Sequence, residues 1–168
     1  MKRGIGLTLL GLMLIPYSVM AQTQNMTGER NAAPDHPEIV FVCQHGAALS
    51  VVSAAYFNKL AKEEHFNVRA LARGVTPQQD VSMSATKGLR ADGVLSETKR
   101  PQILSAEDAA RALRIVAFCP IPSKYSTIAP IETWNDVPAP SDYAAARDAI
   151  LSHLRQLLRQ LKADTNKR

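Results

Sequence analysis

The sequence predicts an α/β domain built around a doubly wound parallel sheet. Two apolar runs rich in β-branched residues, 38–43 and 113–119, are typical of strands buried on both faces. Segments with the apolar spacing of helices lie between and after these runs, and such alternation favours a parallel sheet. A length of 168 residues leaves room for one domain of this kind.

The other elements alternate in the same way, and Gly93 is expected to end one of the helices. The segment 121–140 contains several prolines and Trp134, and is expected to form an irregular loop lying over the domain. In chain order the sequence predicts a loop at 44–48, a helix from 51 to 60, a strand at 66–72, helices at 84–92 and 106–112, and a final helix from 141 to about 161, capped by Ser141 or Asp142.

The first 37 residues are expected to lie outside the domain. Lys2 and Arg3 precede an apolar run, and Val19-Met20-Ala21 has small residues where a signal peptidase reads, so residues 1–21 are interpreted as a signal peptide. A retained membrane anchor is the alternative, but glycines and Pro16 interrupt a run barely long enough to span. Residues 22–37 are interpreted as a flexible linker, 38–163 as the domain and 164–168 as a polar tail.

Two expectations about the protein's surroundings follow. Cleavage would leave a periplasmic or secreted protein without membrane attachment. Removal of Lys2 and Arg3 lowers the formal net charge from +5 to about +3, which is too small to favour nucleic acid as a partner. The sequence does not identify a protein partner.

The loop after the first strand is the candidate binding site. Cys43 ends that strand, and the residues up to Ser50 join it to the start of a helix. In parallel sheets ligands collect at the carboxyl ends of strands, where backbone amides and the helix dipole favour an anion. The same field stabilises a thiolate at Cys43, the form that attacks phosphorus, arsenic or sulfur. A cysteine that merely packs in the core is the alternative.

Residues 39–50, Ile-Val-Phe-Val-Cys-Gln-His-Gly-Ala-Ala-Leu-Ser, resemble the opening of the low-molecular-weight tyrosine phosphatase and arsenate reductase superfamily, where a strand leads into Cys, five residues, Arg and Ser. The small residues after His45 are closer to the arsenate reductase form. The likeness continues through 73–77, Gly93, 99–101 and 115–119 to the final helix, so it spans 38–161.

The resemblance implies a three-layer α/β/α fold with a central four-stranded parallel sheet. It implies Cys43 as the nucleophile and Ser50 as the hydroxyl that donates to the thiolate, although Ser50 could equally be an ordinary residue of the first helical turn. His45 has no second ligand at metal-binding spacing, so neither a metal nor a cofactor is expected. The implied anion-binding loop consists of Gln44, His45, Gly46, Ala47, Ala48 and Leu49.

Two residues depart from the family's pattern. Leu49 stands where the family has the loop arginine, and Ala139, between Pro138 and Pro140, stands where it has the general-acid aspartate. Such an arginine grips two oxygens of the anion through a planar fork, which leucine cannot do. Loss of one charge stabiliser typically costs about a hundredfold to a thousandfold in rate, and loss of a general acid about a hundredfold to ten-thousandfold. Efficient phosphatase activity is therefore not expected.

Three other residues could restore part of this chemistry. Asp136 and Asp142 flank Ala139, but each lies three residues from the expected position, and a turn residue and a helix cap are the alternative interpretations. Another guanidinium, such as that of Arg73, could also replace the missing arginine.

The second cysteine leaves two hypotheses open. Cys119 ends a strand, as Cys43 does, so both sulfurs could lie at the same edge of the sheet. A disulfide between them would mask the nucleophile, and in an oxidising compartment an even cysteine count makes one plausible. The resemblance to thioredoxin-coupled arsenate reductases implies instead that Cys119 attacks Cys43 during turnover, although a third cysteine of that relay is absent.

The sequence thus supports three hypotheses about function. The first is an exported, degenerate member of the superfamily that binds a phosphate-like anion or a phosphorylated ligand, or serves as a structural module. The second is a Cys43-dependent enzyme, a tyrosine phosphatase or a thiol-linked arsenate reductase or redox protein using Cys119. The third is an interaction protein of the cell envelope, suggested by the linker and the proline-rich loop around Trp134.

Overall fold

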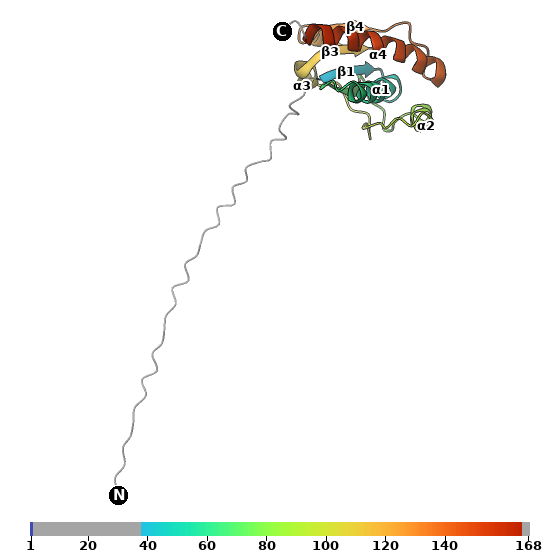
Figure 1. Ribbon diagram of the computed structural model, residues 1–168. Coiled ribbons are helices and arrows are strands. Elements are labelled where there is room, and N and C mark those ends of the chain that lie inside the picture. The colour runs from blue at the N-terminus through green and yellow to red at the C-terminus, as the bar shows by residue number, and fades with distance from the viewer. Residues whose placement is uncertain (2–37, 166–168) are drawn as a thin grey trace. The chain divides into compact units, whose positions relative to one another are not determined.

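The computed structural model describes Met1 and residues 38–165 (Figure 1). The expected cleavage site and the linker at 22–37 lie outside these described residues. Within the described part, no helix combines the length and the apolar character needed to cross a membrane.

The described chain alternates strands and helices, as the sequence predicts. Its elements are β1 (Glu38–Cys43), α1 (Leu49–Glu63), β2 (Arg69–Gly74), α2 (Met83–Ala91), α3 (Ala106–Arg111), β3 (Ala112–Ala117), the 3-10 turn η1 (Ser123–Tyr125), β4 (Ile131–Thr133) and α4 (Tyr143–Thr165).

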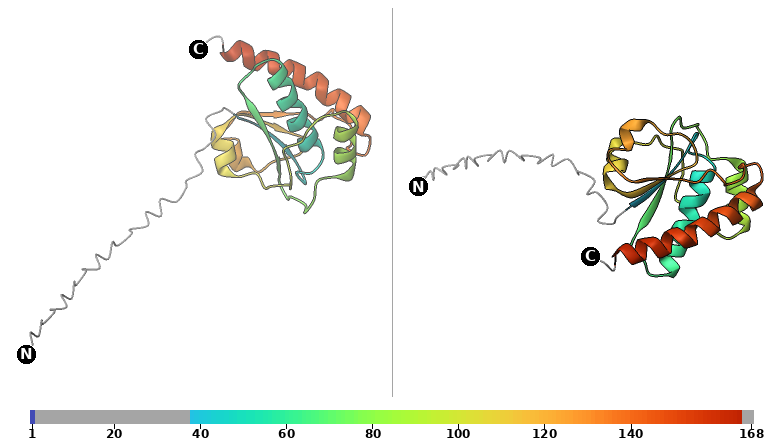
Figure 2. Two further views of the ribbon diagram at one scale, coloured as in Figure 1. Left: turned by 60° about the horizontal axis from the view of Figure 1, so that its bottom comes forward. Right: turned by 90° about the horizontal axis from the view of Figure 1, so that it is seen from above.

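The four strands form one parallel sheet in the order β2-β1-β3-β4. Helices α1, α2 and α4 cover one face, and α3 covers the other (Figure 2). Alternate residues of β1 therefore enter different cores: Ile39 and Phe41 pack with α1 and α4, while Val40 and Val42 pack with the α3 side. The predicted three-layer fold with a four-stranded parallel sheet is confirmed.

Some boundaries differ from the sequence prediction. Strand β2 begins at Arg69 rather than at 66, because Phe66 belongs to a turn in which its carbonyl accepts from the Val68 N–H. The segment 121–140, expected to be irregular, contains η1 and the short strand β4. Helix α4 continues to Thr165, past the predicted end of the final helix at about 161.

Candidate functional site: the loop between Cys43 and Ser50

Cys43 is the last residue of β1, and its side chain is buried at the carboxyl edge of the sheet. Its Sγ lies 3.1 Å from the Oγ of Ser50, a fully buried residue in the first turn of α1. Strand β1 and helix α1 thus bring together the two groups that the sequence singled out. A hydroxyl at this distance can donate to a thiolate and stabilise it.

The loop between Cys43 and Ser50 turns its carbonyl groups away from the Cys43 thiol. The carbonyls of Cys43, Gln44, His45 and Ala47 accept from the backbone N–H groups of Val75, Thr76, Gln78 and Ser82, at 2.9 to 3.2 Å. No described residue accepts from the N–H groups of residues 44–49. The loop and the start of α1 therefore offer a run of unpaired amide donors, the arrangement that binds anions in proteins.

Side chains of the loop add further contacts to the segment 75–82. The amide of Gln44 donates to Thr76 Oγ1 at 2.8 Å, and Nδ1 of His45 lies 3.3 Å from the Thr76 carbonyl oxygen. Thr76 was not predicted as a site residue; its signals in the sequence are the Thr76-Pro77 turn after β2 and the family likeness at 73–77.

Two glycines allow the loop to lie close to the end of β2. Gly46 has a φ of +63°, which favours glycine, and a Cβ on Gly46 would lie 2.8 Å from the Gly74 nitrogen. A Cβ on Gly74 would lie 2.7 Å from the Gly46 nitrogen. Only a residue without a side chain fits at either position.

Leu49 is the first residue of α1, directly before Ser50. It is half-buried against the main core, and it lines a small cavity with Val52, Pro140 and Tyr143. The side chain at the family's arginine position is therefore part of the packing between α1 and the start of α4, and it brings no charge to the loop.

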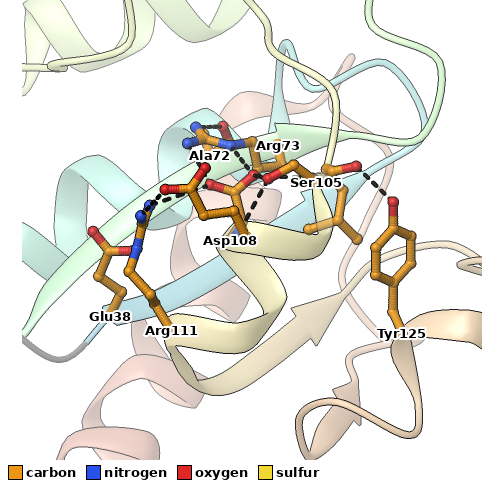
Figure 3. Close-up of polar contacts among 9 residues, drawn as sticks. Glu38, Ala72, Arg73, Ser105, Asp108, Arg111 and Tyr125 are labelled. Carbon is orange, nitrogen blue, oxygen red and sulfur yellow. Dashed lines mark hydrogen bonds and ion pairs between the residues drawn. The ribbon is translucent and has the colours of Figure 1, made fainter. Parts of the chain in front are cut away.

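Arg73 does not replace the missing arginine. Its Nε and Nη2 each donate to the Asp108 carboxylate at 2.8 Å, and its Nη1 donates to the Ala72 carbonyl at 3.0 Å (Figure 3). Burial acts to raise the pKa of Asp108, but the bonds from Arg73 and Ser105 outweigh it and hold that pKa below its ordinary value. The guanidinium is committed to this pair, which ties β2 to α3.

Asp108 was missed as a functional residue in the sequence. It also belongs to a capping box, in which the Asp108 N–H donates to Ser105 Oγ and the Ser105 N–H donates back to the Asp108 carboxylate, both at 3.0 Å. The Ser-x-x-Asp spacing before a helix is the signal that could have found it.

Neither flanking aspartate takes the place of the general acid. Asp136 accepts from His153 at 2.9 Å, and the His153 ring stacks on Trp134. Asp142 caps α4, where its carboxylate accepts from the Ala145 N–H at 3.0 Å. Ala139 itself is exposed. Trp134 is buried against Phe41 and Phe118, so the proline-rich loop does lie over the core, as predicted.

Cys119 lies two residues after β3, beside the end of β1, where the Phe118 N–H donates to the Val42 carbonyl at 2.8 Å. Burial raises the pKa of the Cys119 thiol, and the charge on the nearby Cys43 raises it further. Cys119 follows β3 instead of ending it as predicted, and both cysteines lie at the carboxyl ends of the neighbouring strands β1 and β3. Both cysteines are free thiols in the structure, and the disulfide between them stays a prediction.

Within residues 38–165, no three His, Cys, Asp or Glu side chains form a group that could hold a metal ion. The chemical features of the site are thus a buried thiol with a hydroxyl partner, a cradle of amide donors and a second thiol nearby. These features can bind an oxyanion and can exchange a disulfide.

Comparison with solved structures identifies the same fold in other proteins. YfkJ from Bacillus subtilis aligns with a TM-score of 0.66 at 18% identity, over 77% of this chain and 96% of that one. A low-molecular-weight protein tyrosine phosphatase from Bacillus subtilis gives a TM-score of 0.63 at 21% identity, over 76% and 99%. A thioredoxin-dependent arsenate reductase from Corynebacterium glutamicum gives 0.62 at 15% identity, over 80% and 66%. No family model and no curated protein matches the sequence.

Proposed function

We propose that this chain, which has the fold of low-molecular-weight tyrosine phosphatases and arsenate reductases, binds a phosphate-like oxyanion without efficient phosphatase activity. The observation that carries the proposal is the loop itself. Its carbonyls are tied to the segment 75–82, and its amides have no acceptor among the described residues. Charge-assisted bonds from backbone N–H groups to an anion are worth about 1.5–3 kcal/mol each.

Turnover needs more than binding. Charge that spreads over the transferred group requires a cation in the loop, and the leaving oxygen requires a proton donor. Leu49 and Ala139 supply neither, while Arg73 and Asp142 are occupied elsewhere. The Cys43–Ser50 contact supports thiolate formation. Turnover stays slow because no cation stabilises the charge of the transition state and no acid protonates the leaving oxygen.

The test combines binding with turnover. Calorimetric titration with inorganic phosphate should show binding that survives in a Cys43→Ser variant, because the backbone amides supply the contacts. Hydrolysis of p-nitrophenyl phosphate should be negligible beside that of an active phosphatase of the same fold. Absence of phosphate binding, or hydrolysis at the rate of the active phosphatase, would refute the proposal.

The proposal includes export of the protein from the cytoplasm. Residues 1–21 support export to the periplasm or the medium. A mature protein that starts at Gln22 in the exported fraction, shown by N-terminal sequencing, is the expected result.

A second candidate function rests on the placement of the two cysteines. Cys43 ends β1 and Cys119 follows the neighbouring strand β3, so the two thiols could form a reversible disulfide. The reaction would release two electrons and two protons to a disulfide reagent, which is reduced to two thiols. Incubation in glutathione buffers followed by mass spectrometry should then show an intramolecular bond, and a Cys119→Ser variant should instead retain glutathione on Cys43. Failure to form the intramolecular bond at any ratio of reduced to oxidised glutathione would eliminate this candidate.

A further inference from the structure

We propose that a cavity along the outer edge of β2 is a second binding site, for a small organic anion, separate from the Cys43 loop. This edge cavity lies between residues 69–73 of β2, one side of α1 and the segment 96–102, and has a volume of about 470 Å³. Its size is typical of small-molecule pockets. None of the loop residues 44–49 lines it.

The cavity exists because β2 has a strand on one side only. Strand β1 pairs with it along its length, but on the outer side the described part of the chain returns only at Gly74. There the Gly74 N–H donates to the Gln102 carbonyl at 2.8 Å, and the Leu104 N–H donates to the Gly74 carbonyl at 2.9 Å. Before Gly74, the segment 96–102 stays apart from the strand and leaves a space.

Three of the outer backbone groups of β2 are bonded to side chains. Asn58 of α1 donates to the Ala70 carbonyl at 3.1 Å and accepts from the Ala70 N–H at 2.7 Å. Arg73 donates to the Ala72 carbonyl at 3.0 Å. These bonds block the pairing of another strand, so an extended peptide is not the expected occupant.

One donor on this edge has no protein partner. In a parallel strand the outward-facing residues alternate, so the N–H of Ala72 points outward with those of Ala70 and Gly74. No described residue accepts from it, although Ala72 is only 2% exposed. A buried amide without an acceptor is unfavourable, so an oxygen atom from a bound molecule would stabilise it.

The charges around the cavity favour an anion. Four basic side chains and one carboxylate line it. Arg69 pairs with the carboxylate of Glu97, and Arg73 pairs with Asp108. Lys99 and Arg100 have no carboxylate partner among the described residues. An anionic group close to these two side chains would meet positive charge that nothing in the described part neutralises.

The residues that line the cavity indicate the chemistry of the ligand outside its anionic group. The alanines at 54, 55, 70 and 72 form a smooth apolar side, while Ser96, Thr98 and Gln102 offer polar groups. A compact molecule with hydroxyl groups and one phosphate or carboxylate matches both. We therefore assign the cavity to a sugar-like organic anion.

Chemical-shift titration of the ¹⁵N-labelled protein tests this assignment. Ribose 5-phosphate and gluconate serve as the phosphate and carboxylate probes, with ribose as the neutral control. At least one of the two anions should shift the Ala72 amide signal, and the stronger of the two identifies the anionic group. No shift with either anion, or an equal shift with ribose, would overturn the proposal.

Matched variants separate the cavity from the Cys43 loop. The double variant Lys99→Glu/Arg100→Glu should weaken binding at Ala72 by about tenfold or more, because both unneutralised cations are reversed. The control Lys87→Glu/Arg90→Glu makes the same charge change on exposed residues of α2 and should leave the affinity unchanged. Equal weakening by both double variants would overturn the proposal, as would loss of the phosphate-induced shifts of residues 44–49 in Lys99→Glu/Arg100→Glu.

Discussion

The backbones of Gly46 and Gly74 are in direct contact, and this contact places the amide-lined loop against the end of β2. A Cβ on either residue would come within 2.8 Å of the other's nitrogen. The contact connects the loop to the rest of the domain, because Gly74 is also bonded to residues 102 and 104.

Substitution of Gly46 should therefore weaken anion binding. Gly46→Ala adds both backbone strain and a clash, so the loop must move away from Gly74. Loss of one amide bond from the loop to the anion should reduce phosphate affinity by about tenfold or more. Gly93→Ala is the matched control, since Gly93 has a φ of +66° but open space around its Cβ position. Calorimetry should find normal phosphate affinity in the control; equal losses in both variants would contradict the role of the contact.

Restoration of the two missing groups should raise turnover. The double variant Leu49→Arg/Ala139→Asp supplies a cation at the first residue of α1 and an acid in the loop before α4. The expected gain in p-nitrophenyl phosphate hydrolysis is about a hundredfold or more over the wild type. A Cys43→Ser change added to the double variant should abolish the gain, and persistence of hydrolysis without the thiol would contradict the assignment of Cys43.

Asp108 should make the stability of the domain sensitive to acid. Its pKa in the folded state lies below the ordinary value of 3.8, because the bonds from Arg73 and Ser105 outweigh the effect of burial. The ionised carboxylate thus stabilises the fold above about pH 4, and this contribution disappears as the pH falls through the folded pKa.

Asp108→Asn removes the charge that balances the buried Arg73, which should lower the free energy of unfolding by about 2–4 kcal/mol at pH 7. Urea denaturation of both proteins between pH 3 and 7 measures the difference, which should shrink below pH 4. A difference that stays constant over that range would contradict the ion pair.

Cys119 should become more reactive when Cys43 is replaced. Burial raises the pKa of Cys119, and Cys43 raises it further. In Cys43→Ser only the effect of burial remains, so a larger fraction of Cys119 is ionised at pH 8 and alkylation by iodoacetamide should be faster. An unchanged rate of Cys119 alkylation, followed by mass spectrometry, would show that the two sulfurs do not interact.

Strand β1 could be predicted from the sequence because it depends on a local pattern, whereas the Cys43–Ser50 contact was implied by the family resemblance. The apolar run 38–43 is buried at every position, so its limits are visible in the residues themselves. Asp142 as the cap of α4 and Gly93 at the end of α2 follow from short-range chemistry in the same way.

Features that depend on distant pairing could not be predicted. Strand β4 has three residues, and only its pairing with β3 distinguishes it from the surrounding loop. The commitment of Arg73 to Asp108 joins residues 35 positions apart, and nothing near Arg73 reveals its partner. The edge cavity likewise depends on where the segment 96–102 lies, which local patterns do not determine.

One titration tests the central claim, binding of a phosphoryl group by the loop without its transfer. ¹⁵N-labelled protein is mixed with p-nitrophenyl phosphate, and amide shifts and the ³¹P spectrum are followed in the same sample. The account predicts that the amide signals of residues 44–49 shift while the ³¹P signal of the ester persists for hours. Rapid appearance of inorganic phosphate, or amides that do not respond to the ester, would contradict it.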